Sequence, residues 1–177
     1  QYWAIYHKDV HPNVLFFDTS AAAQSQEQYN EARPTSSVVE FGSNGGATNT
    51  SGDDSILYCF APVAGYSAMG SYTGNGSTDG TFVYTGFRPR WILLKNINYS
   101  GASWIIIDTA RETYNVTKLR LMPNTSQAEI NSSQILDITS NGFKVRDTDT
   151  YWNGSGNTII YYAVAENPFQ ANGGLAR

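Results

Sequence analysis

"GSYTGNGSTDGTFVYTGFRPRWILLK", residues 70–95, places two runs of strand-forming side chains on either side of a glycine-rich corner. Tyr, Phe, Val, Trp and Ile favour strands. Gly74, Gly76 and Gly80 permit positive φ and a close approach of another backbone segment. The stretch therefore predicts strands joined by an architectural turn.

The spacing excludes two nucleotide-binding loops. A Walker A loop needs four residues between its glycines and then Lys-Ser/Thr, but five residues separate Gly74 from Gly80, and Thr81 follows. A dinucleotide-binding loop, G-x-G-x-x-G, needs two residues between its second and third glycines and then a helix. Here three residues separate Gly76 from Gly80, and a strand-like run follows Gly80.

Pro89 lies near the end of the same stretch and has no amide hydrogen, so it is predicted to mark a bend between strands. Arg88 and Arg90 flank it. One of these arginines is predicted to pair with Asp108 or Glu166.

The strand-and-turn pattern repeats along the chain, because short runs of β-branched and aromatic residues alternate with Gly, Asn, Ser and Asp clusters. Strands are expected at residues 2–7, 14–18, 37–42, 55–63, 66–73, 81–87, 90–97, 103–108, 118–122, 134–138, 142–146 and 158–165. Such a density, without crossover helices, predicts an all-β fold: a single antiparallel β-sandwich domain over 1–177, of jelly-roll or lectin-like kind.

Several segments carry more specific signals. "WILLK" (91–95) and "WIIID" (104–108) are apolar at consecutive positions, which is typical of central strands covered on both faces. "TSNGFKV" (139–145) predicts a hairpin turning at Asn141-Gly142. Residues 19–32, "TSAAAQSQEQYNEA", form either the one short helix of the fold, beginning at Thr19 or Ser20, or a loop, and the polar tracts 43–54 and 147–157 are expected to be surface loops.

Composition narrows the function classes. The 177 residues are 41% apolar and 15% charged, with a net charge of -4, which argues against a nucleic-acid partner. No run has the length of a membrane-spanning helix, so membrane insertion is not expected. Because the chain starts at Gln1, we expect it to be processed or part of something longer. Cys59 is the single cysteine, and its apolar neighbours predict a buried side chain.

Metal-binding patterns are weak. His7 and His11 are four residues apart, but Pro12 argues against the helix that would place both imidazoles on one side. Asn75 and Asp79 in the glycine-rich corner are the calcium candidates, since carbonyl and carboxylate oxygens are the ligands that calcium prefers. No other cofactor is expected.

Catalytic patterns are also weak. No G-x-S-x-G elbow surrounds a serine. A glycosidase needs two carboxylates across a cleft, one with a raised pKa, and the candidates for such a pair are Asp108, Glu129, Asp137 and Glu166.

Aromatic side chains make up 14% of the chain. Their faces can stack on sugar rings while tyrosine hydroxyls bond the ring hydroxyls, so a lectin role is physically available. Trp91 and Trp104 begin apolar runs and are expected in the core. The candidate ligand-binding residues are Tyr151, Trp152, Tyr72, Tyr99 and Tyr114.

Four stretches together resemble a known domain: "YWAIYHKDV" (2–10), the run 58–96 that begins "YCFAPVAGYSAMG", "WIIIDTARETYN" (104–115) and "YYAVAENPF" (161–169). They are similar to a domain of unknown mechanism in tail-fibre and other virion structural proteins of tailed bacteriophages, notably marine and cyanobacterial phages. The resemblance spans nearly the whole chain, and the run "YTGNGxxDGxFVYTGFRPxW" is its most specific part. The loops 43–54 and 147–157 look individual to this protein.

The resemblance implies a non-enzymatic module of an extracellular virion appendage, with loops that contact other virion proteins or a host-surface glycan. It also implies a homo-oligomer, for which a trimer is one expected form. No catalytic residue can be carried over from the family. A free-standing carbohydrate-binding module is the alternative, and a polysaccharide depolymerase is the third possibility. The host, the glycan and the place in the particle stay open.

Overall fold

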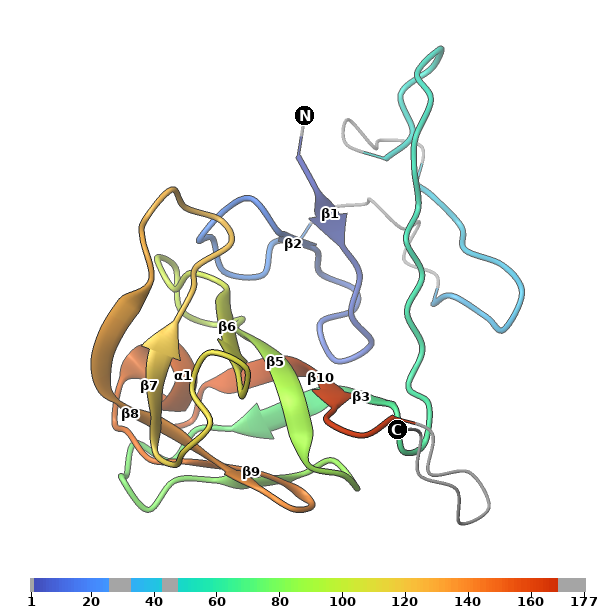
Figure 1. Ribbon diagram of the computed structural model, residues 1–177. Helices are drawn as coiled ribbons and strands as arrows, with labels where there is room; N and C mark the ends of the chain where they lie inside the picture. The colour runs from blue at the N-terminus through green and yellow to red at the C-terminus, as the bar shows by residue number, and fades with distance from the viewer. Residues whose placement is uncertain (1, 26–32, 43–47, 169–177) are drawn as a thin grey trace.

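The computed structural model describes residues 2–25, 33–42 and 48–168, and these form an antiparallel β-sandwich (Figure 1). The strands are β1 (Ala4–Ile5), β2 (Leu15–Phe16), β3 (Ser67–Thr73), β4 (Phe82–Tyr84), β5 (Pro89–Asn96), β6 (Ile105–Asp108), β7 (Thr117–Arg120), β8 (Ile130–Thr139), β9 (Gly142–Val145) and β10 (Thr158–Ala165). One short helix, α1 (Thr150–Asn153), precedes β10. The predicted fold class, an all-β sandwich, is confirmed.

Two four-stranded sheets form the body of the molecule. The first sheet has the order β3-β10-β5-β6 and the second β4-β9-β8-β7, while β1 and β2 make a small separate pair. The main core lies between the two large sheets, where Ile92, Leu94 and Ile159 from the first meet Ile138 and Phe143 from the second. This is the layered packing that sandwiches use to bury one face of each sheet.

The first sheet is also covered on its other face, and this explains the consecutive apolar residues of "WILLK". Successive side chains of a strand point to opposite faces. Ile159 therefore joins the main core, while Ile160 packs with Val10, Leu15 and Trp104 in a second cluster. The indole Nε1 of Trp104 donates to the carbonyl oxygen of Phe16 at 3.0 Å, so residues 2–25, which we call the N-terminal segment, are tied to the sheet by a hydrogen bond as well as by packing.

The prediction for the two apolar runs is correct for one of them. β5 lies between β10 and β6 and is a central strand. β6 ends the order of its sheet, and in the described part of the chain an isolated bridge from Ile106 to Leu121 is the only backbone pairing beyond it. Its apolar run is explained by burial of Ile105 and Ile107 rather than by a central position.

The glycine-rich corner carries the chain from the first sheet to the second, since β3 belongs to one and β4 to the other. Gly76 has φ +67°, a conformation that side chains rarely adopt. Gly74 and Gly80 have ordinary φ values, but a Cβ at Gly80 would lie 2.6 Å from the carbonyl oxygen of Val145, and one at Gly74 would collide with the backbone of Gly154. The three glycines thus serve turn geometry at one position and close packing at the other two.

Residues 85–88 return the chain to the first sheet, and Pro89 is the buried first residue of β5. A strand start is a position that tolerates the missing amide hydrogen. Arg88 Nε lies 2.9 Å from Glu166 Oε2, so one arginine of the flanking pair does bind Glu166. This ion pair joins the approach to β5 with the end of β10.

The hairpin at 139–145 is present, but its turn is displaced by one residue. Thr139 pairs with Gly142, so Ser140 and Asn141 form the turn and Gly142 begins β9. Gly142 has an ordinary φ, and a Cβ there would collide with the carbonyl oxygen of Val83 in β4. The close approach of the neighbouring strand, rather than the turn, requires this glycine.

Three other local predictions are wrong. Segments 37–42 and 55–63 form no strand. Of the two alternatives for 19–32, residues 19–25 form the loop and no helix, while 26–32 lie outside the described residues. The tract 147–157, expected to be a loop, contains α1, whose first turn is capped by the Asp149 carboxylate accepting from Tyr151 N at 2.9 Å. The tract 48–54 is exposed except at its first residue and has no regular structure; 43–47 lie outside the described residues.

None of the helices in the described ranges has the length and apolar character needed to cross a membrane.

Candidate functional site

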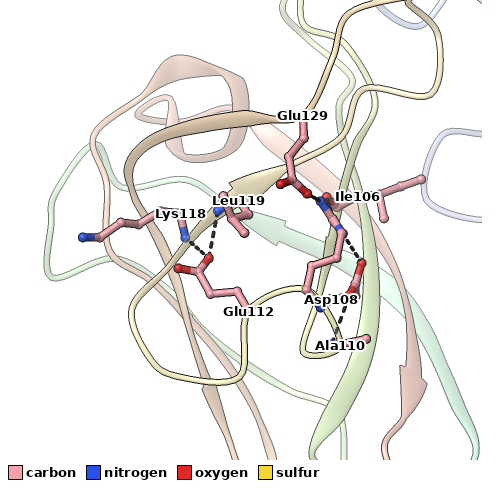
Figure 2. Close-up of polar contacts among 8 residues, drawn as sticks. Ile106, Asp108, Ala110, Glu112, Lys118, Leu119 and Glu129 are labelled. Atoms are coloured by element: carbon pink, nitrogen blue, oxygen red, sulfur yellow. Dashed lines mark hydrogen bonds and ion pairs between the residues drawn. The ribbon is translucent and has the colours of Figure 1, made fainter.

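The carboxylates considered for catalysis are held by arginines. Arg111 lies between two of them, with its Nε 2.6 Å from Asp108 Oδ2 and its Nη1 2.6 Å from Glu129 Oε2 (Figure 2). Its Nη2 donates to the carbonyl oxygen of Ile106 at 3.1 Å. Arg111 therefore fastens the loop after β6 both to that strand and to the start of β8.

The electrostatics of Asp108 disfavour a role as a general acid. Burial acts to raise its pKa, but the hydrogen bonds and charge of Arg111 outweigh burial and hold the pKa of Asp108 below its ordinary value. Asp108 Oδ1 also accepts from the backbone amides of Ala110 and Arg111. A glycosidase acid needs the opposite shift, which keeps a proton on the carboxyl group at neutral pH.

The other two catalytic candidates, Asp137 and Glu166, are also paired with arginines, and Glu112 is bound by backbone amides. Asp137 Oδ2 lies 2.6 Å from Arg146 Nε, and Glu166 is paired with Arg88 as described above. Glu112 accepts from the backbone amides of Lys118 and Leu119 across the β6–β7 loop (Figure 2). These carboxylates link strands and loops to one another.

The calcium candidates Asn75 and Asp79 are occupied by hydrogen bonds and ion pairs. Asn75 Oδ1 accepts from Ser77 N at 3.0 Å and from Asn153 Nδ2 at 3.2 Å. Asp79 Oδ1 lies 2.6 Å from Lys144 Nζ, whose hydrogen bond and charge lower the pKa of Asp79. Within the described ranges, no three His, Cys, Asp or Glu side chains gather in a way that could hold a metal ion.

Asn153 is a residue that sequence reasoning missed. Its fully buried side chain donates to the carbonyl oxygens of Ser77 at 2.8 Å and Asp147 at 2.6 Å, and its Oδ1 accepts from Asn75 N at 3.0 Å. It therefore locks α1 to the glycine-rich corner. Its only sequence signal was a place in an Asn- and Gly-rich tract, which also predicts an exposed loop.

Two of the five predicted ligand-binding aromatics are core residues, and their prediction is wrong. Trp152 is 1% exposed, with the guanidinium carbon of Arg120 5.0 Å from its ring centroid. Tyr72 is also buried, and its hydroxyl donates to the carbonyl oxygen of Trp152 at 2.7 Å. Helix α1 turns Trp152 inward although its sequence neighbours are polar, so neither ring has a free face for a ligand.

The remaining three aromatics are accessible but do not form one site. Tyr99 and Tyr151 are neighbours, with ring centroids 5.9 Å apart, and Tyr151 is half-buried against the core. Tyr114 is exposed in the β6–β7 loop and makes no ring contact with them in the described part of the chain. The sequence alone could not show that Tyr114 lies apart from the pair formed by Tyr99 and Tyr151.

The largest departure from the sequence prediction is the segment Ser55–Val63, which we name the arm. All nine of its residues are exposed, including Cys59, whose predicted burial is wrong. Figure 1 shows the arm as part of a long extended trace, cyan to green, that runs beside the sandwich and leads into β3. It touches its own chain where the Tyr58 ring stacks on Trp3 and the Phe60 ring lies 5.6 Å from that of Tyr162.

The arm is the candidate functional site, because the exposed apolar side chains are concentrated there. Ile56 is 81% exposed and Phe60 65%. Consecutive exposed apolar side chains of this kind are typical of an interaction surface.

No curated protein and no solved structure matches this chain. A family model described as "Domain of unknown function (DUF7483)" matches residues 1–168, which include both sheets, the N-terminal segment and the arm. The chain therefore belongs to the DUF7483 family of domains of unknown function.

Proposed function

We propose that this protein is a non-enzymatic structural module of an extracellular assembly, namely a tail fibre or similar appendage of a phage virion. The single observation that carries the proposal is the exposed apolar arm, since nine consecutive uncharged residues lie outside the sandwich. A particle subunit needs such a surface, which becomes buried when neighbouring subunits assemble.

Two further features support this role. The sandwich is a rigid platform, with a core between its two large sheets and a second cluster beneath the N-terminal segment. The acidic side chains that a polysaccharide-cleaving enzyme would use are bound to arginines. The resemblance to virion domains of tailed phages agrees with a particle location and supplies the class of assembly.

The test is to locate the chain in particles. Virions are purified from the culture that produces the protein, their subunits are identified by mass spectrometry, and gold-labelled antibodies against the sandwich are viewed by electron microscopy. We expect a fixed copy number per particle and label on an appendage.

Other outcomes would contradict the proposal. One is a protein found only outside particles. Another is glycan binding by a monomer that is lost on Tyr99→Ala, which would favour the lectin alternative. A third is release of reducing ends from host polysaccharide that is abolished by Glu129→Gln, which would favour a depolymerase.

A further inference from the structure

In the described part of the chain, residues 55–62 of the arm have no strand partner, and Val63 at its end forms an isolated bridge with Ser67 of β3. Ile56, Leu57, Tyr58 and Phe60 form a run with strong strand preference. Yet, in the described part of the chain, no backbone amide of 54–62 donates a backbone hydrogen bond, and the arm is assigned no strand. A strand-forming segment with unpaired backbone groups is a template for pairing with another chain.

Apolar side chains lie on both sides of the arm. Because side chains alternate along an extended backbone, Tyr58 and Phe60 lie on one side, and both contact their own chain, at Trp3 and Tyr162. Leu57 and Cys59 belong to the opposite side. Ile56, on the same side as these two rings, is 81% exposed, and Leu57, on the opposite side, is 48% exposed, so both sides of the arm present apolar surface to water.

The amount of exposed apolar surface suits a stable interface. At their exposed fractions, the side chains of Trp3, Ile56, Leu57, Tyr58, Phe60 and Val63 present together on the order of 700 Å², close to the roughly 800 Å² that each partner buries in a standard protein interface. Contact with one partner would bury most of this exposed apolar surface.

The uncharged composition of the arm indicates the kind of partner that it would bind. Residues 55–66 carry no charged side chain, so the surface offers nothing to attract a basic or acidic partner. A second copy presents the same uncharged, strand-forming segment, and identical extended segments can pair through backbone hydrogen bonds whatever their side chains. Pro62 has no amide hydrogen and sets the limit of such pairing towards β3.

We infer that residues 55–61 form an intermolecular β-strand with a second copy of this chain, burying the exposed apolar side chains of the arm, Leu57 among them, between the copies. The inference rests on the proposed function, because it assigns the subunit contact which that function requires. It specifies that the contact is homotypic and that the arm becomes ordered as a strand only on association.

The first test measures the molar mass by size-exclusion chromatography with multi-angle light scattering. The wild-type protein is expected to be a homo-oligomer at micromolar concentration. Leu57→Glu, which places a charge in the contact, is expected to raise the dissociation constant at least about tenfold. Val38→Glu is the matched control, since Val38 is 51% exposed but lies outside the arm, and it should leave the oligomer intact.

The second test follows hydrogen exchange of the amides of 56–61. In the oligomer these amides are expected to exchange at least about tenfold more slowly than in the Leu57→Glu monomer, and protection should fall on dilution of the wild-type protein. Unchanged near-UV circular dichroism of Leu57→Glu would show that the sandwich still folds.

Three results would overturn the inference: a wild-type monomer, an oligomer that survives Leu57→Glu, or amides that are protected in the monomer because the arm folds back on its own β3. Each is distinguishable from failure of the proposed function. A chain present in virions but monomeric in isolation would refute only the homotypic arm contact, whereas an arm-dependent oligomer absent from virions would refute only the particle role.

Discussion

At the scale of single residues, Lys95 stands out because a lysine is almost never fully buried without a carboxylate partner. Its side chain is 1% exposed, its Nζ donates to the carbonyl oxygen of Ala102 and lies 5.9 Å from the Trp104 ring centroid, and no ion pair joins it to an acidic side chain among the described residues. Burial lowers the pKa of Lys95 to about 8. The charged form is thus disfavoured in the folded protein.

This pKa predicts that stability rises with pH. Between pH 8 and 10.5 the unfolded chain binds more protons at this lysine than the folded protein does, so the free energy of unfolding increases through that window, by about 2 kcal/mol from pH 7 to 9.5. Urea unfolding at the two pH values measures the gain. Lys95→Met should abolish it, whereas Lys118→Met, at an exposed position, should retain it. An equal gain in Lys95→Met would contradict the prediction.

Burial of individual residues was the least predictable feature from sequence. Trp152 lies among Asp, Thr, Asn and Gly, and its partners Arg120 and Tyr72 are distant in the chain. Cys59 lies among apolar residues and is exposed. Both errors arise because burial depends on contacts between distant segments, whereas the neighbours in sequence report only local preference.

At the scale of strands, Gly142 is the position at which three strands meet. It pairs with Tyr84 of β4 on one side and with Thr139 of β8 on the other. Gly142→Ala is expected to lower the free energy of unfolding by about 3 kcal/mol, because the new Cβ would collide with backbone atoms of β4 that cannot move without losing the pairing. Gly52→Ala is the control: its φ of +86° is strained, but nothing lies within 4 Å, so about 1 kcal/mol is expected. Equal losses in urea unfolding would argue against the steric explanation.

Strands were predictable where alternation and burial agree with a partner in the same chain. The expected segments 66–73, 90–97, 142–146 and 158–165 correspond closely to β3, β5, β9 and β10. The segment 55–62 has equally strong strand preference but no partner strand among the described residues. A strand is a property of a pair, so a single sequence can show the preference but cannot show where the partner lies.

At the scale of the whole molecule, the candidate site was the part least accessible to sequence reasoning. The ion pair between Arg88 and Glu166 was among the expected pairings, and it joins residues that flank two strands of one sheet. The clamp of Asp108 and Glu129 on Arg111 was not expected, since it joins a tight loop to a strand about twenty residues away. The arm was identified as the candidate site because, in the folded structure, its residues are exposed and belong to neither large sheet.

The N-terminal segment and the sandwich should behave as one body even when the chain between them is cut. Ala23 N donates to Ile97 O and Gly101 N to Ser20 O, both at 2.9 Å, in addition to the packing of Trp104 against Phe17. Brief chymotrypsin treatment of the Leu57→Glu monomer is expected to cleave at Tyr58 or Phe60, because an exposed segment without backbone hydrogen bonds fits a protease cleft. The two fragments should elute together in native gel filtration and separate only in denaturant.

Phe17→Ala should weaken their association, since it removes the ring contact with Trp104 from the N-terminal side and leaves the sandwich intact. An N-terminal fragment that elutes alone from otherwise unmodified protein would show that the second cluster does not hold the segment, and that the arm is a link between separate units.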